Sequence, residues 1–155
     1  MSNFPIRRLR RLRRTEKIRD LVQEVSLSPS DLICPVFVEE GIQTKKQIQS
    51  MPAIERMPLS DIVNEVDAIA ELGIPAVMLF GIPQNKDDEG TSAYVDHGIV
   101  QKAISEIRKN FGDKIVVMAD VCLCQYTSSG HCGLVKDEII DNDSSIATLS
   151  KIAVS

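Results

Sequence analysis

The sequence predicts an α/β protein built on a parallel β-sheet. Three short apolar runs rich in β-forming residues alternate with stretches in which apolar residues recur every three or four positions. The runs begin near residues 32, 76 and 114, a spacing typical of repeated strand–helix–strand units. Both an open doubly wound sheet and part of a (β/α)8 barrel fit this order. A whole barrel needs about 250 residues, more than the 155 of this chain.

The composition is that of a globular domain, with 43% hydrophobic and 26% charged residues. The net charge of −4 is too small to indicate a nucleic-acid or membrane partner for the whole chain. No apolar run approaches the roughly 20 residues of a membrane span, and no signal peptide is visible. We therefore expect a cytoplasmic protein, in which clustered cysteines are more often metal ligands or catalytic groups than disulfides.

The start of the chain is strongly basic, because residues 7–14 read RRLRRLRR. A targeting peptide, a nucleic-acid-binding arm and an arm that docks on its own or a neighbouring subunit are three interpretations. The docking arm is favoured, since no aromatic residues are interleaved as single-stranded nucleic acid would require. We expect residues 1–28 to form this arm and a helix, and residues 29–155 to form the amino-terminal part of a barrel.

The first predicted elements follow in order. A helix begins at Thr15, and its apolar stripe comprises Ile18, Leu21, Val22 and Val25. Pro29 prevents the helix from continuing. Residues 32–38 form a buried strand, and the polar residues 39–58 form a long loop.

The next helix begins at Ser60, which can cap it, and ends at Gly73. Its apolar stripe comprises Ile62, Val63, Val66, Ile69 and Ala70. Residues 75–82 form the second strand, and residues 97–112 form a helix that ends at Gly112. The apolar side of this helix comprises Val100, Ala103, Ile104, Ile107 and Phe111.

The third strand covers residues 114–124, and a loop of about twenty residues follows it. The last helix opens at Asn142 and Asp143. We expect four of its residues to face inward: Ile146, Leu149, Ile152 and Ala153.

The segment DVCLCQYTSSGHCG, residues 120–133, holds three of the four cysteines. Asp120, Cys122 and Cys124 share parity, so on a strand they point to one side. Gly130 lets the loop turn back and bring Cys132 to the same point. Three thiolates are a good ligand set for Zn²⁺ and leave a fourth position for water or substrate, as in catalytic zinc sites. A carboxylate such as Asp120 inside a buried strand is costly unless it is paired or coordinating, which indicates a functional role.

Other interpretations of this segment stay open. The three cysteines could be ordinary buried thiols, a Cys122–Cys132 disulfide or a thiol redox couple, and His131 could be a ligand or an outer hydrogen-bond donor. Elsewhere we expect Cys34 to be a core residue, the acidic loop 86–90 to be solvated rather than to bind Mg²⁺, and His97 to lie at a helix start.

The cysteine segment closely resembles the zinc-binding segment of the porphobilinogen synthase (5-aminolevulinate dehydratase) family. Similar motifs run along the whole chain: RRLRR, DLICPVFVEEG, QSMPAIERMPLS, GIPAVMLFGIP, KDDEGTSAY and NDSSIATLSKIAVS. The resemblance implies a TIM (β/α)8 barrel, of which this chain covers the N-terminal arm and about three β/α units. It also implies that the arm embraces a neighbouring subunit in a homo-oligomer, usually an octamer.

The resemblance further implies that Cys122, Cys124 and Cys132 hold a catalytic zinc and that Asp120 lies beside it in the active site. The implied reaction condenses two molecules of 5-aminolevulinate to porphobilinogen, with loss of two waters, in tetrapyrrole (haem) biosynthesis. Zinc would act as a Lewis acid on one substrate, and a Mg²⁺ site elsewhere in the full-length protein is compatible with the family.

Two departures from the family qualify these expectations. Ser129 stands where the family usually has histidine, which removes a hydrogen bond or metal contact near the ligands. The family's two Schiff-base lysines fall beyond Ser155, so we expect an N-terminal fragment that binds zinc weakly and makes no porphobilinogen alone. The alternative is a non-catalytic zinc-binding half-barrel that assembles with full-length subunits.

Overall fold

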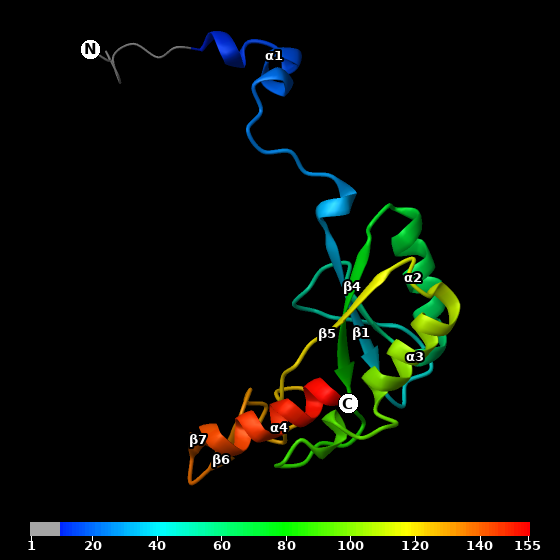
Figure 1. The fold of residues 1–155 in the computed structure, drawn as a ribbon, viewed down its shortest axis with the longest axis vertical. Helices are drawn as coiled ribbons and strands as arrows, with labels where there is room; N and C mark the ends of the chain where they lie inside the picture. Colours follow the sequence, from blue (N-terminus) through cyan, green and yellow to red (C-terminus); the bar gives the residue numbers. More distant parts are fainter. Residues whose placement is uncertain (1–9) are drawn as a thin grey trace, which may run out of the picture.

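The computed structural model describes residues 10–155, and three parallel strands form its centre (Figure 1). They are β1 (Ile33–Glu39), β4 (Ala76–Ile82) and β5 (Val116–Ala119), and they lie side by side in this order. Ile33 pairs with Ala76, and Ala76 pairs with Val116. The predicted strand–helix–strand order and the parallel sheet are therefore confirmed.

The predicted loop 39–58 was wrong in part, because it contains two short strands. Strand β3 (Glu55–Met57) runs parallel to β1, and β2 (Lys46–Gln47) runs antiparallel to β3, which gives the sheet order β2-β3-β1-β4-β5. Glu39 at the end of β1 forms ion pairs with Lys46 and Arg56 of these strands. With two and three residues, β2 and β3 are too short to show the alternation of apolar and polar residues from which a strand is predicted.

Helices α2 (Ile62–Glu71) and α3 (Ile99–Phe111) cover one face of the sheet (Figure 1). The core between helices and sheet is formed by Val36, Val38, Met57, Ile62, Val66, Ile69, Val77, Leu79, Ile99, Val100, Ala103, Ile107 and Ile115. Both helices end at the predicted glycines, Gly73 and Gly112, whose φ angles are +77° and +57°. The start of α2 differs from the prediction: Asp61 is the N-cap, and Ser60 lies in the preceding 3-10 turn, Leu59–Asp61.

The opposite face of the sheet carries no helix among residues 10–155. Phe37 and Phe80 lie on adjacent strands of this face and stack with their ring centroids 4.9 Å apart. Both rings are only half-buried. In a closed barrel this face lines the interior.

The N-terminal segment extends away from the sheet (Figure 1). It holds the 3-10 turn Arg11–Arg13, α1 (Glu16–Leu21) and the 3-10 turn Pro29–Asp31. The predicted helix start is correct, because the Thr15 hydroxyl oxygen accepts a hydrogen bond from the Ile18 N–H at 3.2 Å. The helix ends sooner than predicted, at Leu21, and no residue of it is buried.

Residues 7–9 of the arginine-rich stretch lie outside the described residues, and the division of the chain after residue 28 stays a prediction. Within residues 10–155, no helix has both the length and the apolar character needed to cross a membrane.

A hairpin and the last helix lie beyond the carboxyl ends of the strands (Figure 1). The hairpin, β6 (Leu134–Lys136) with β7 (Ile139–Asp141), occupies the second half of the predicted loop, and Asp137 and Glu138 form its turn with positive φ. Helix α4 (Asn142–Val154) begins near the predicted residue. Its inward face was predicted correctly only in part: Leu149 and Ile152 are half-buried, but Ile146 is 54% exposed and Ala153 is exposed. Ser145 and Thr148, which were not predicted, are buried. Ser145 joins the helix to the hairpin, because its Oγ accepts a hydrogen bond from the Leu134 N–H at 2.8 Å, a contact that an apolar stripe does not report.

Candidate metal centre

The strand that leads into the cysteine segment ends earlier than predicted, at Ala119. The Asp120 N–H still donates to the Leu79 carbonyl at 3.2 Å. Four residues later the chain turns, since the Leu123 carbonyl accepts hydrogen bonds from the Tyr126 and Thr127 N–H groups, each at 2.9 Å. The parity argument for Cys122 and Cys124 was therefore wrong. A turn, rather than strand alternation, brings their two sulfurs to one side.

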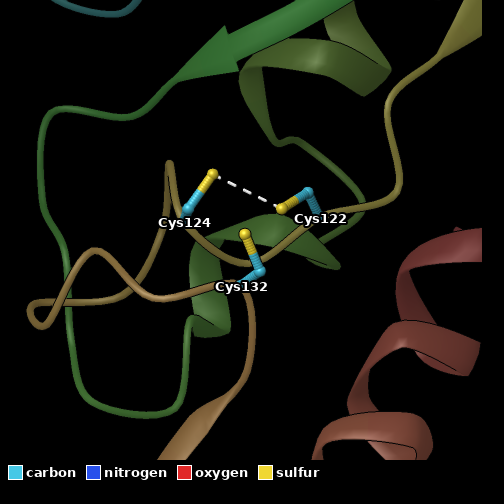
Figure 2. Close-up of side chains that lie close together, drawn as sticks. All are labelled: Cys122, Cys124 and Cys132. Carbon is cyan, nitrogen blue, oxygen red and sulfur yellow. Dashed lines mark hydrogen bonds between the residues drawn. The ribbon is translucent and has the colours of Figure 1, made fainter.

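The sulfurs of Cys122, Cys124 and Cys132 converge on one point (Figure 2). All three Sγ atoms lie within 4.8 Å of one another, and those of Cys122 and Cys124 are 3.4 Å apart. A tetrahedral centre with metal–sulfur bonds of about 2.3 Å separates its sulfurs by about 3.8 Å. The three thiols therefore fit a single metal ion with small movements, and all four cysteines of the chain are free.

The thiols differ in how readily they lose a proton. Burial acts to raise the pKa of Cys122, but the hydrogen bond from the Cys124 N–H and contacts with the other two thiols outweigh it and lower this pKa. Burial and the hydrogen bond to Cys122 raise the pKa of Cys124 to about 12. The hydrogen bond to Cys122 likewise raises the pKa of Cys132. The contacts within the cluster thus favour the thiolate form at Cys122 over the other two, and a metal ion binds these sulfurs only as thiolates.

Gln125 links the cysteine cluster to Asp120. Its Nε2 donates to Oδ2 of Asp120 at 2.8 Å, and its Oε1 accepts from the Cys124 thiol at 3.5 Å. The amide therefore holds one carboxylate oxygen in place and stands against one of the three thiols. The next residue, Tyr126, is only 4% exposed. Burial and the charge of Asp120 raise its pKa to about 12.

The acidic loop 86–90 is solvated as predicted at Lys86, Asp88 and Glu89, whereas Asp87 braces the cysteine segment. The Asp87 N–H donates to the Tyr126 carbonyl at 3.3 Å, and the Ser128 N–H donates to the Asp87 carbonyl at 3.0 Å. The Asp87 carboxylate accepts hydrogen bonds from the Thr91 hydroxyl and from the N–H groups of Thr91 and Glu89, which lower its pKa. Asp88, in contrast, is exposed as predicted.

The remaining predicted positions are placed as follows. His131 is exposed, and the cluster of potential ligands found in residues 10–155 does not include it. His97 is exposed beside Gly98, the N-cap of α3. Cys34 packs against the core, and burial raises its pKa.

Sequence reasoning missed three residues that shape the site: Gln125, Thr127 and Asp87. Gln125 and Thr127 lie within the quoted cysteine segment, so their polar character was available as a signal. Asp87 lies about forty residues earlier in the chain, and its pairing with the site has no local signature.

Known proteins match this chain along nearly all of it. A sequence model of the family described as "Delta-aminolevulinic acid dehydratase" matches residues 6–155. The chain is 53% identical over 148 residues to the delta-aminolevulinic acid dehydratase of Bacillus subtilis, covering 96% of this chain and 45% of the relative. It is 49% identical over 152 residues to that of Methanothermus sociabilis, covering 98% and 47%. The chain thus spans about half the length of these curated relatives.

A solved structure is similar as well. It is the delta-aminolevulinic acid dehydratase (porphobilinogen synthase) of Toxoplasma gondii ME49 in complex with the reaction product porphobilinogen. The TM-score is 0.88 at 36% identity, and the match covers 96% of this chain and 43% of that one. This likeness assigns the parallel sheet to the TIM (β/α)8 barrel family, as the sequence predicted.

Proposed function

The chain belongs to the delta-aminolevulinic acid dehydratase family, and on this basis we propose that the protein containing it condenses two molecules of 5-aminolevulinate to porphobilinogen. The observation that carries the proposal is the convergence of three sulfurs close to Asp120 at the carboxyl end of β5. Barrel enzymes place their active sites at this end of the strands.

The proposed metal is Zn²⁺, held by Cys122, Cys124 and Cys132. Three soft sulfur donors with separations close to those of a tetrahedral centre support this choice. Zinc with three protein ligands keeps one position for substrate and supplies Lewis acidity there.

Asp120 is the proposed catalytic residue of this part of the barrel. Its Oδ2 is occupied by the Gln125 amide, which leaves Oδ1 to accept a hydrogen bond from the amino group of a substrate. Forming the new carbon–nitrogen bond requires that amino group to lose protons, and a carboxylate held at a fixed angle is suited to take one. Gln125 serves to keep the carboxylate oriented rather than to react.

The activity is proposed for a polypeptide that also contains the remaining part of the barrel, because this chain spans only 45% of the Bacillus subtilis relative. A second candidate is a non-catalytic zinc-binding half-barrel that assembles with full-length subunits. The exposed outer edge of β5, where Val116 is 51% exposed, favours assembly with further strands.

Residues 10–28 are proposed to dock on a neighbouring subunit of a homo-oligomer. Every described residue of α1 and of the turn before it is unburied, and Leu21 and Leu27 are 85% and 81% exposed. Large apolar side chains exposed next to several arginines are typical of a segment that is covered by a partner. The native mass of the purified protein with and without residues 1–28 tests this: the mass should fall to that of a smaller assembly when they are removed.

Two measurements test the proposed function. The natural polypeptide that contains these residues is supplied with 5-aminolevulinate and assayed for porphobilinogen, before and after zinc is removed with a chelator. We expect product only with zinc, and a loss of activity in Asp120→Asn that leaves zinc content unchanged. Zinc bound without product supports the half-barrel candidate, whereas neither zinc nor product contradicts both.

A further inference from the structure

The three cysteines are held in place very differently. Cys122 and Cys124 are half-buried and flank Leu123, which is fully buried. Cys132 is exposed and lies in a segment without helix or strand, between Thr127 and the hairpin strand β6. Gly130 of this segment has φ +71°, and a Cβ placed there would meet nothing within 4 Å. Packing therefore does not fix the chain that enters Cys132, although Gly133, which follows it, is buried against Ile140 and Ser145.

Thr127 supplies the missing restraint. Its side chain is almost fully buried, with 1% exposure of the residue. Its Oγ1 lies 3.2 Å from the Leu123 carbonyl oxygen and 3.1 Å from the His131 carbonyl oxygen. The hydroxyl is therefore placed between the turn that carries Cys122 and Cys124 and the peptide group that joins His131 to Cys132.

A hydroxyl has one proton, so one of the two carbonyls must receive it. The Leu123 carbonyl already accepts two backbone N–H groups, from Tyr126 and Thr127, at 2.9 Å each. Two donors satisfy both lone pairs of a carbonyl oxygen. The His131 carbonyl has no other donor among residues 10–155. The proton accordingly goes to His131, and the hydrogen bond fixes the peptide group that enters Cys132.

Thr127 is itself held rigidly. It forms a parallel bridge with Asp87, and the Tyr126 and Ser128 backbone groups on either side of it bond to Asp87. Its carbonyl accepts the Gly130 N–H at 3.2 Å. A hydrogen bond from so well fixed a residue restrains its partner, because little freedom is left at the donor end.

We propose that Thr127 is a positioning residue of the metal centre, whose hydroxyl holds Cys132 within bonding range of the metal shared with Cys122 and Cys124. The inference rests on the zinc site of the proposed function. It concerns the third ligand alone: without the hydroxyl, Cys122 and Cys124 keep their geometry, and Cys132 loses the restraint on the chain that enters it.

The test compares Thr127→Val, which keeps the shape and removes the hydroxyl, with Thr127→Ser, which keeps the hydroxyl. The natural polypeptide that contains these residues is titrated with Zn²⁺ against a chromophoric chelator, and with Co²⁺ to record the thiolate-to-cobalt charge-transfer band. We expect Thr127→Val to raise the dissociation constant for Zn²⁺ about 10-fold, the lower end of the range for losing a contact that orients a metal ligand from outside. The cobalt band should lose the contribution of one sulfur.

The serine variant should restore both the affinity and the cobalt band, which a purely structural role would not explain. Thr148→Val is the matched control, since Thr148 is also a buried threonine but lies on α4, outside the cluster. It should bind both metals as the unmodified chain does. Should the valine variant fail to fold, Thr127→Ser and Thr127→Ala carry the same comparison, because they differ only in the hydroxyl.

The possible outcomes separate the two proposals. Equal zinc affinity and equal cobalt spectra for Thr127→Val and the unmodified chain overturn the role of Thr127 and leave the zinc site standing. Failure of the unmodified chain to bind either metal overturns the zinc site itself, and the role of Thr127 with it.

Discussion

The turn that carries Cys122 and Cys124 and the segment that carries Cys132 reach the same point by different physical means. The turn follows the edge strand β5 and is anchored by Leu123, which is fully buried. The Cys132 segment is exposed and depends on the hydrogen bond from the Thr127 hydroxyl to the His131 carbonyl and on the one that the Ser128 N–H donates to the Asp87 carbonyl. Apolar burial thus preorganises two ligands, and polar contacts preorganise the third. Substitutions in the two regions are therefore expected to affect stability, metal affinity and activity to different degrees.

The largest effect is expected from removing a ligand. Cys122→Ser takes away one of the three sulfur ligands, so zinc affinity should fall by more than the roughly 100-fold that outer contacts contribute. Zinc titration of the chain measures this. Cys34→Ser is the control, because Cys34 lies in β1 outside the cluster. Equal losses in both variants would mean that the cluster is not the metal site.

Removing the buried side chain of Leu123 should lower the free energy of unfolding more than it lowers the affinity for zinc. Leu123→Ala leaves a cavity beneath the turn and should lower the free energy of unfolding by about 3 kcal/mol. Chemical denaturation of the metal-free chain measures the change. Val121→Ala, two residues earlier and 44% exposed, should change the unfolding free energy by less than about 1 kcal/mol. If both variants are equally stable, burial of Leu123 does not hold the turn.

A smaller effect is expected at Gln125, which joins the anchored turn to Asp120. Gln125→Met removes the Nε2 donor to Asp120 at similar length. The kcat for porphobilinogen formation by the natural polypeptide should fall about 10-fold with little change in KM, because orientation of the carboxylate is lost. The kcat of Gln125→Asn should fall equally, because its side chain is too short to reach the Asp120 carboxylate. An unchanged kcat in both variants would show that Asp120 needs no support from residue 125.

The smallest effect is expected at Asp87, whose hydrogen bonds support the cysteine segment, and this effect depends on pH. The Thr91 hydrogen bonds lower the pKa of Asp87 in the folded protein. The ionised carboxylate therefore stabilises the fold at pH values above the pKa that Asp87 has in the unfolded chain, and this stabilisation is lost as pH falls through its pKa in the folded protein. Asp87→Asn should therefore cost about 1 kcal/mol of unfolding free energy at neutral pH. The difference from the unmodified chain should shrink in acid.

Denaturation curves recorded from neutral to acid pH check the prediction. Asp88→Asn is the control, since the neighbouring side chain is exposed. It should be neutral at every pH. A cost for Asp87→Asn that stays constant down to acid pH would contradict the charged hydrogen bonds proposed for Asp87.

Local patterns in the sequence determined much of the architecture. The apolar stripes of α2 and α3, the helix ends at Gly73 and Gly112 and the order of strands follow from spacings within one element. Such patterns report which face a single helix or strand buries. The membership of Cys122, Cys124 and Cys132 in one cluster was also predictable, because the three lie within eleven residues.

Only the tertiary structure decided the features that depend on distant residues. The pairing of β3 with β1, the bonds between Asp87 and the chain around Thr127, and the burial of Ser145 and Thr148 on α4 are all of this kind. Each requires one segment to meet another across a closed loop, and the chain carries no period that encodes such a meeting. The sequence therefore determined which sulfurs gather, while the tertiary structure decided that a turn, a buried leucine and one threonine hydroxyl gather them.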